Sequence, residues 1–291
     1  MDKRIKSSIF HLLFFCAKGA KPFRVSLFLY AKNIYRGWGL CPQLIHGDCL
    51  EVMKDIPESS VDMVLCDLPY QMTDCKWDKI IPFPELWEQY KRVVKDNGAV
   101  VLFSIQPFTT KLIHSNLKNF RYCWYWKKNN KTGGQFCKYQ PMRCIEDICV
   151  FYRKSPVYNP QGLKKLDKPI IRQAEKHRSN IYEWRGKNAV SIQQYTGYPQ
   201  HLLEFKNDTM NKNRLHPTQK PVALLEYLIQ TYTNPGEIVL DNCMGSGSTG
   251  EAAIKTGRKF IGIEKDEHFY KVAKERINGV VLCHEQNRMR I

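Results

Sequence analysis

The segment from Ile238 to Glu264 restricts the fold of this chain more than any other. An apolar run, Ile238 to Leu240, leads into a glycine-rich loop, and the helix-like stretch Thr249 to Lys255 leads into a second apolar run, Phe260 to Ile263. A strand, a helix and a strand within about 27 residues indicate that the two strands pair in parallel, as they do in α/β proteins.

The same alternation occurs earlier in the chain. A short strand from Leu44 precedes a helix-like stretch, Leu50 to Ile56, and then the buried strand Val61 to Cys66. The pattern therefore predicts a mostly parallel sheet built from both ends of the chain. The remaining predicted elements are helices over Leu86–Val94, Thr109–Asn116, Thr218–Tyr232 and about Glu267–Ile277, and strands over Ala99–Phe103, Phe120–Trp126 and Asp147–Tyr152.

Two stretches interrupt this alternation. Residues 1–42 are basic and aromatic, and we expect them to form an N-terminal extension. Residues 153–214 are polar, basic and aromatic, which indicates an insertion that contacts another molecule. The regular pattern on either side of this insertion predicts that residues 43–152 and 215–291 are two halves of one domain.

The charge of the chain favours a polyanionic partner. Lysine and arginine together number 45, against 28 aspartate and glutamate residues, so the formal net charge is +17 over 291 residues. Such an excess favours nucleic acid and predicts association that weakens with salt. Ribosome-associated and membrane-surface proteins share this property, so charge alone does not decide between them.

The cysteine spacing argues against a metal or disulfide framework. The 11 cysteines are scattered without a Cys-x-x-Cys pair, and we expect reduced thiols in a cytoplasmic protein. Apolar runs such as Ile9 to Ala17 are much shorter than the roughly 18 residues that a membrane span requires. The basic start followed by that run resembles a secretory signal only faintly.

The glycine-rich loop predicts a site for a nucleotide-like cofactor. Gly245, Gly247 and Gly250 match the dinucleotide fingerprint, and Glu264 stands close to the offset of about 20 residues at which a ribose-binding acid is expected. Taken alone, this spacing points to NAD. Asp241, directly before the loop, would repel a pyrophosphate but attract an ammonium group. S-adenosylmethionine carries an ammonium group and no phosphate, so the combination favours that cofactor.

A second constellation, Asp67-Leu68-Pro69-Tyr70, ends the strand Val61 to Cys66. The Asp67 carboxylate and the Leu68 carbonyl, which the following proline holds in extended geometry, could accept hydrogen bonds from one exocyclic amino group. Two such acceptors make the nitrogen more tetrahedral, and dipoles aimed at its developing positive charge lower the barrier to methylation. Tyr70 could stack on a base extruded from a duplex. The candidate catalytic residues are Asp67, Leu68, Pro69 and Tyr70.

With both motifs in view, the chain resembles the beta group of amino DNA methyltransferases. In that group the catalytic tetrapeptide comes first, the target-recognition region follows, and the cofactor loop comes last, which is the order found here. The resemblance covers about residues 44–278. Its most specific parts are His46–Glu51, Asp67–Tyr70, His216–Pro221 and Asp241–Glu264.

The resemblance implies a Rossmann-like, doubly wound α/β fold with a mostly parallel seven-stranded sheet and an inserted target-recognition region over 153–214. It implies that Asp48 lies close to the adenine of the cofactor. Lys220 could steer the cofactor, although the following proline is equally explained by a first helical turn. The candidate cofactor-binding residues are Asp48, Lys220, Asp241, Asn242, Cys243, Gly245, Ser246, Gly247, Thr249 and Glu264; no metal is expected.

The chain departs from the family pattern at three places. Leu68 replaces a common proline, but its expected role uses only the backbone. Asn242-Cys243 replaces a frequent Pro-Phe and could alter packing against the cofactor. Residues 1–42 have no recognised counterpart.

The resemblance predicts site-specific transfer of a methyl group from S-adenosylmethionine to N6 of adenine in double-stranded DNA, by base flipping. Asp67 favours adenine, because cytosine-N4 members more often carry serine there. Cytosine-N4 methylation is the alternative within the class, and RNA methylation is a weaker one. From other classes, an NAD-linked oxidoreductase and an inactive DNA-binding module stay open. The expected setting is the cytoplasm of a bacterium, or a phage or prophage, with no membrane; a homodimer and a cognate restriction endonuclease are candidate partners.

Overall fold

The computed structural model of the chain describes residues 42–71, 79–173, 190–207 and 219–288. The predicted extension over 1–42, apart from Pro42, and parts of the predicted insertion over 153–214 lie outside these residues. The strands are β1 Gln43–His46, β2 Val61–Asp67, β3 Val94–Ser104, β4 Phe120–Thr132, β5 Arg143–Phe151, β6 Lys164–Gln173, β7 Val190–Thr196, β8 Leu202–Glu204, β9 Ile238–Asp241 and β10 Lys259–Glu264. The helices are α3 Cys49–Met53, α4 Phe83–Val93, α5 Phe108–Ser115, α6 Val222–Tyr232, α7 Ser248–Lys255 and α8 Glu267–Arg288, with a 3-10 turn η1 at Gly134–Phe136.

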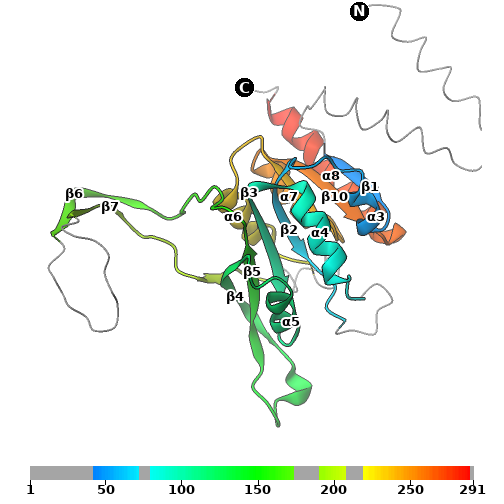
Figure 1. Ribbon diagram of the computed structural model, residues 1–291, viewed down its shortest axis with the longest axis horizontal. Helices are drawn as coiled ribbons and strands as arrows, with labels where there is room; N and C mark the ends of the chain where they lie inside the picture. Colours follow the sequence, from blue (N-terminus) through cyan, green and yellow to red (C-terminus); the bar gives the residue numbers. More distant parts are fainter. Residues whose placement is uncertain (1–41, 72–78, 174–189, 208–218, 289–291) are drawn as a thin grey trace, which may run out of the picture. The chain divides into compact units, whose positions relative to one another are not determined.

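The main sheet has the strand order β1-β10-β9-β2-β3-β5-β4-β8 (Figure 1). The five strands from β1 to β3 pair in parallel, and β5 is antiparallel to both β3 and β4. The sheet has eight strands rather than the seven that the resemblance implied. The additional strand, β8, pairs with β4 and comes from the stretch that we assigned to the insertion. With three residues, it carries no periodicity that a sequence pattern could reveal.

Helices pack on both faces of this sheet. Met63 and Leu65 of β2 lie in a buried cluster with apolar residues of α6, α7 and α8, whereas Val64 and Cys66 lie in a second cluster with residues of α3, α4 and α5. Successive side chains of a strand point to opposite faces, and a strand covered on both sides is largely apolar, as the run Val61 to Cys66 is at every position except Asp62. The fold is therefore a doubly wound α/β fold.

The topology places the predicted site residues on one edge of the sheet. Asp67 ends β2, Asp241 ends β9 and Glu264 ends β10, and these three strands are neighbours in the order β10-β9-β2. In open parallel sheets, ligands bind outside the carboxyl ends of the strands. The two ends of the chain therefore contribute to the same edge, as the sequence predicted.

β6 and β7 form a separate two-stranded antiparallel sheet. Both belong to the predicted insertion, and their exposed apolar residues include Ile170, Ile171, Ile192 and Tyr195.

Among the described residues, no helix is long and apolar enough to cross a membrane.

Candidate active site

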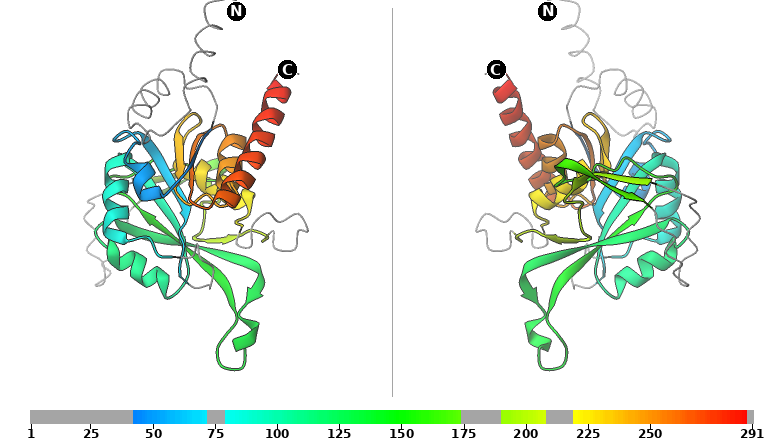
Figure 2. Two further views of the ribbon diagram at one scale, coloured as in Figure 1. Left: turned by 90° about the vertical axis from the view of Figure 1, so that its right-hand side faces the viewer. Right: turned by 90° about the vertical axis from the view of Figure 1, so that its left-hand side faces the viewer.

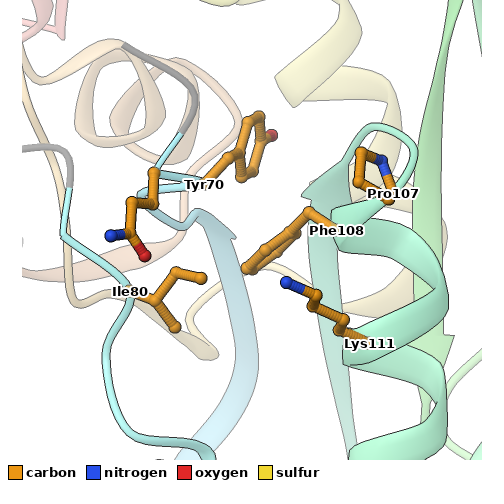
Figure 3. Close-up of a pocket in the computed structure, with 6 residues that line it drawn as sticks. Tyr70, Ile80, Pro107, Phe108 and Lys111 are labelled. Atoms are coloured by element: carbon orange, nitrogen blue, oxygen red, sulfur yellow. The ribbon is translucent and has the colours of Figure 1, made fainter. Parts of the chain in front are cut away.

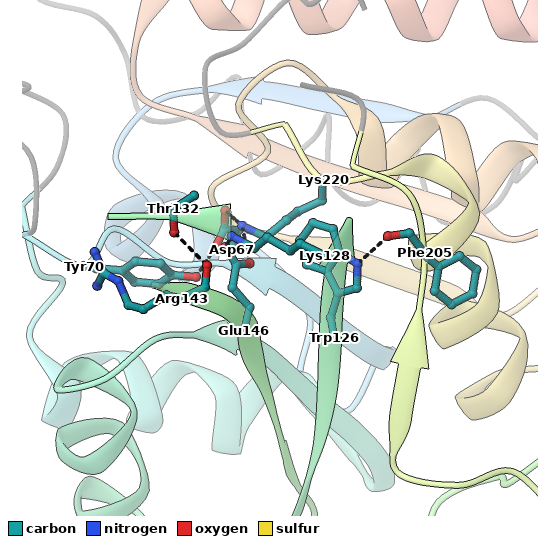
Figure 4. A network of polar contacts seen from close by, with 9 residues as sticks. All are labelled: Asp67, Tyr70, Trp126, Lys128, Thr132, Arg143, Glu146, Phe205 and Lys220. Atoms are coloured by element: carbon teal, nitrogen blue, oxygen red, sulfur yellow. Dashed lines mark hydrogen bonds and ion pairs between the residues drawn. The ribbon is translucent and has the colours of Figure 1, made fainter. Parts of the chain in front are cut away.

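The Asp67 carboxylate is the centre of a polar network at the end of β2 (Figure 4). Its Oδ1 accepts a hydrogen bond from the Tyr70 hydroxyl, and its Oδ2 accepts one from Lys220 Nζ. A carboxylate offers about four acceptor positions, so Asp67 keeps capacity for a further donor. Its side chain remains 24% exposed, so such a donor could reach it.

Lys220 joins Asp67 to a second buried carboxylate. Lys220 Nζ lies 3.5 Å from Glu146 Oε2 on β5, and the other oxygen of Glu146 forms an ion pair with Lys128 of β4. The side chains of Glu146, Lys128 and Lys220 are 11%, 10% and 8% exposed. Two ammonium groups thus face two carboxylates, which keeps this buried cluster electrically balanced.

The pKa shifts of Lys220 and Glu146 favour the charged forms of these two residues. Burial by itself would lower the pKa of Lys220, but the charges of Asp67 and Glu146 outweigh burial, and its pKa is raised. Burial alone would raise the pKa of Glu146, but Lys220 and Lys128 outweigh it, and its pKa is lowered. The sequence analysis named Lys220 as a candidate for steering the cofactor, and the structure places its ammonium group against Asp67 of the predicted catalytic tetrapeptide. Sequence reasoning missed Glu146 and Lys128 altogether.

Tyr70, the last residue of the tetrapeptide, lines a pocket (Figure 3). Leu68 is buried, and the ring of Tyr70 packs against that of Phe108 with 4.9 Å between centroids. The pocket therefore has an aromatic wall directly beside the Asp67 carboxylate, which suits a flat ring carrying an amino group. The residues that line the pocket are Tyr70, Gln71, Ile80, Pro107, Phe108 and Lys111.

Asp241 is buried beneath the glycine-rich loop. The backbone N–H of Cys243 donates to its Oδ1 at 3.1 Å, and the Thr249 hydroxyl also bonds this carboxylate. Burial nevertheless dominates and raises the pKa of Asp241 to about 6. The negative charge expected on Asp241 is therefore unfavourable in this buried position, and a cationic ligand group would stabilise it.

This raised pKa predicts how stability changes with pH. A group whose pKa is higher in the folded state than in the unfolded state stabilises the fold at low pH, and this contribution is lost as the pH rises through the folded-state pKa. Relative to Asp241→Asn, the wild type should therefore lose about 3 kcal/mol of unfolding free energy between about pH 4 and pH 7. Urea unfolding at several pH values measures this, with Asp55→Asn, at an exposed position, as the control. Parallel pH curves for wild type and Asp241→Asn would contradict the assignment.

Glu264 holds the glycine-rich loop in place. Its Oε2 accepts from the backbone N–H of Gly245 at 2.8 Å, and its Oε1 accepts from that of Asp266 at the same distance. Burial raises its pKa. The ribose contacts predicted for Glu264 would use the acceptor positions that these two backbone groups leave.

The loop itself turns sharply between β9 and α7. Gly245 and Gly247 have φ values of 50° and 79°, which side chains rarely adopt. A Cβ on Gly247 would also lie only 3.1 Å from the Cβ of Ala273. Ser246 and Thr249 are both buried between these turns and the helix. The glycines therefore fix the path of the loop as well as its packing on α8.

The remaining predicted residues are Asp48, which lies before α3, and Asn242 and Cys243, which lie in the loop itself. Asp48 caps the N-terminus of α3 through a 3.0 Å bond from Leu50 N and pairs with Lys265 at 2.9 Å. Asn242 is buried and accepts from the Tyr90 hydroxyl at 2.6 Å, which anchors the loop to α4. Cys243, half-buried, lies in the same loop. Within the described ranges, no group of His, Cys, Asp and Glu side chains could hold a metal ion.

A doubly wound sheet with a carboxylate at the end of β2 and a glycine-rich loop after the neighbouring strand β9 has the architecture of a Rossmann-like methyltransferase. The solved structures agree. The chain aligns with the M1.HpyAVI–SAM complex at 26% identity and a TM-score of 0.56, over 82% of this chain and 100% of that chain. PvuII DNA methyltransferase (cytosine-N4-specific) has the same fold, with a TM-score of 0.59 at 16% identity over 81% and 90% of the two chains.

Sequence comparison defines the family. Residues 61–275 match the family model described as DNA methylase. The type II methyltransferase M.HpaI of Haemophilus parainfluenzae is 30% identical over 257 residues, 81% of this chain and 74% of the relative. The DNA adenine methyltransferase YhdJ of Escherichia coli (strain K12) is 29% identical over 255 residues, 81% and 82% of the two chains. The chain belongs to the N6/N4 DNA methylase family, so the NAD-linked oxidoreductase alternative is set aside.

Proposed function

We propose that this protein transfers a methyl group from S-adenosylmethionine to the N6 amino group of adenine in duplex DNA. The observation that carries the proposal is the position of Asp67, whose carboxylate ends β2 beside an aromatic-walled pocket and one strand away from the cofactor loop. One relative supports adenine as the target, since YhdJ is named a DNA adenine methyltransferase.

The charges around the glycine-rich loop fit S-adenosylmethionine better than a dinucleotide. Asp241 and Glu264 place two carboxylates at neighbouring strand ends, where a pyrophosphate would be repelled. Glu264 would hold ribose hydroxyl groups, and Asp241 would lie near the cationic methionine end. When bound there, S-adenosylmethionine supplies an electrophilic methyl group. M1.HpyAVI, which is 26% identical to this chain, has a solved structure described as a complex with SAM, and this supports the same cofactor.

The residues of the tetrapeptide would act on the target base. The Asp67 carboxylate and the Leu68 carbonyl would accept the two amino hydrogens, which localises the nitrogen lone pair for attack on the methyl group. Tyr70 would stack on the extruded base, and its hydroxyl orients Asp67 through the hydrogen bond seen in the structure. Lys220, held by Asp67 and Glu146, keeps the carboxylate oriented before the base enters.

Nucleoside analysis tests the proposal. The protein is incubated with duplex DNA and S-adenosylmethionine, and the DNA is digested to nucleosides and examined by mass spectrometry. We expect N6-methyladenine. Detection of N4-methylcytosine without N6-methyladenine would mean that cytosine, not adenine, is the target. The absence of any methylated base would overturn the proposal. Methylation-sensitive long-read sequencing of host DNA with and without the gene would also give the recognition sequence.

The proposal extends to location and partners. Both substrates are available in the cytoplasm of a bacterium, where we place the activity. A cognate restriction endonuclease would be a nuclease whose cleavage this methylation blocks, and digestion of methylated against unmethylated host DNA by cell extract tests for it. A homodimer would have twice the chain mass of 34.1 kDa, which light scattering measures.

A further inference from the structure

β4 and β5 continue as a hairpin beyond every other strand of the main sheet. The pairing of β3 with β5 ends at Ser104 and Asp147, and the pairing of β8 with β4 ends at Glu204 and Lys127. Residues 128–145 therefore form a hairpin arm, in which the end of β4 pairs with the start of β5 at Thr132 and Arg143 after a register shift, and η1 lies in the connection (Figure 2). The sequence pattern predicted that the first of these strands ends at Trp126, and it indicated no partner for the arm.

The arm begins at the edge of the sheet that carries Asp67. Since β5 runs antiparallel to β3, its first residues lie at the end where β2 and β3 finish. Glu146, the residue directly after the arm, forms ion pairs with Lys128 at the base of the arm and with Lys220, which contacts Asp67. The arm is thus attached beside the catalytic tetrapeptide.

The arm is basic and carries no acidic residue. Its 18 positions, 128–145, include Lys128, Lys131, Lys138 and Arg143 and neither aspartate nor glutamate. Lys128 is neutralised by Glu146. The other three are exposed, and none of them forms an ion pair with a carboxylate of the described residues. Three uncompensated positive charges on one ribbon form an electrostatic site for a polyanion.

The arm also exposes apolar side chains, which a hairpin that contacts only water does not require. Tyr139 is 87% exposed and Phe136 is 47% exposed, both near the turn; Met142, directly before β5, and Ile145, on β5, are 39% and 43% exposed. Aromatic rings interleaved with cations are the combination on which nucleic-acid bases stack while phosphates are neutralised. The major groove of B-DNA, about 12 Å wide, admits a two-stranded β-ribbon.

We propose that this arm binds duplex DNA next to the target base. Lys131, Lys138 and Arg143 would contact phosphates, and Tyr139 would stack on bases. The inference rests on the proposed function, and it adds a DNA-binding element outside the stretch 153–214 to which the sequence assigned target recognition. It also explains why a cation-rich ribbon is attached directly to the ion-pair network around Asp67.

The test compares two triple variants of the whole protein. Lys131→Ala/Lys138→Ala/Arg143→Ala removes the charges of the arm, and Lys91→Ala/Lys118→Ala/Lys274→Ala removes the same charge from exposed positions elsewhere. Binding of a labelled duplex is measured at several salt concentrations, and methylation is measured at saturating and limiting DNA. We expect the arm variant to lower the slope of log affinity against log salt by about 2 to 3, since each phosphate contact contributes about 0.9. Its KM for DNA should rise at least about 10-fold, with kcat retained, whereas the control variant should change the slope by less than about 1.

A single substitution tests the aromatic contact separately. Tyr139→Ala should weaken DNA binding about 10-fold while leaving the salt slope unchanged, because stacking releases no counterions. An arm variant that binds and methylates DNA like the wild type, with an unchanged slope, would overturn the arm proposal while the proposed function stands. A wild type that neither binds nor methylates DNA would overturn both. Unaltered melting temperatures of the variants exclude unfolding as the cause.

Discussion

Asp67→Ala is expected to lower the rate of methyl transfer by about 10³-fold or more, while the protein still binds S-adenosylmethionine and DNA. The magnitude follows from the loss of a preorganised acceptor that acts on the charge developing at the amino nitrogen. Asp67→Asn is the matched variant, because it keeps the shape but loses the negative charge. Single-turnover transfer of a labelled methyl group measures the rate, and calorimetry measures binding of the cofactor and of duplex DNA separately.

The result for Asp67 depends on an intact ion-pair network, so stability must be followed in the same variants. Removing the charge of Asp67 leaves Lys220 with Glu146 as its carboxylate partner. A fall in activity accompanied by lost cofactor binding would indicate a damaged fold rather than a damaged catalyst. Methylation by Asp67→Ala at the wild-type rate would mean that the chemistry takes place elsewhere.

Glu146→Gln is expected to lower the free energy of unfolding by about 3 kcal/mol, the range found when one partner of a buried pair is removed. The substitution leaves two buried ammonium groups, Lys128 and Lys220, facing a single carboxylate. Urea denaturation with linear extrapolation measures the change. The matched control is Glu204→Gln, which breaks the exposed pair with Lys127 at 2.8 Å and should cost less than about 1 kcal/mol.

A double variant separates charge imbalance from lost packing. Glu146→Gln/Lys128→Met restores equal numbers of positive and negative charges in the cluster, so it should recover part of the stability that Glu146→Gln loses. The coupling between the two positions is then the difference between the double variant and the sum of the single ones. Equal losses for Glu146→Gln and Glu204→Gln would show that the buried network does not stabilise the fold.

The sheet and the strand ends could be predicted because their signals are local. Val61 to Cys66 is apolar at every position but one, as expected for a strand covered on both faces, and the acids Asp67, Asp241 and Glu264 directly follow apolar runs. Parallel pairing then brings these acids to one edge. Each predicted helix has a counterpart, but the bounds differ: α4 starts three residues earlier at Phe83, α6 starts at Val222 rather than at Thr218, and α8 continues to Arg288.

The ion-pair network could not be predicted, because its members are distant in the sequence. Lys220 and Asp67 are 153 positions apart, and Glu146 and Lys128 occupy strands that look partly polar. Only the topology reveals that these charges share one buried space. The contact with Asp67 indicates a second role for Lys220. The contact of Lys220 with the cofactor remains a prediction.

The arm escaped prediction for a different reason. Hydrophobic alternation ends at Trp126, so the sequence pattern indicated the end of a strand there. The backbone nevertheless continues as a strand to Thr132, which pairs with Arg143 of β5 after a register shift that follows Lys127. A rule that predicts strands from the alternation of apolar side chains therefore does not detect the polar positions of this hairpin.

The structure of the protein with a cofactor analogue and a duplex containing its target site tests the central claim most directly. The account predicts one adenine outside the helical stack, with its N6 about 2.6 to 3.2 Å from both an Asp67 carboxylate oxygen and the Leu68 carbonyl oxygen. It also predicts the ring of that adenine against Tyr70. An adenine that stays paired in the duplex, or an extruded base whose amino group contacts neither oxygen, would contradict it.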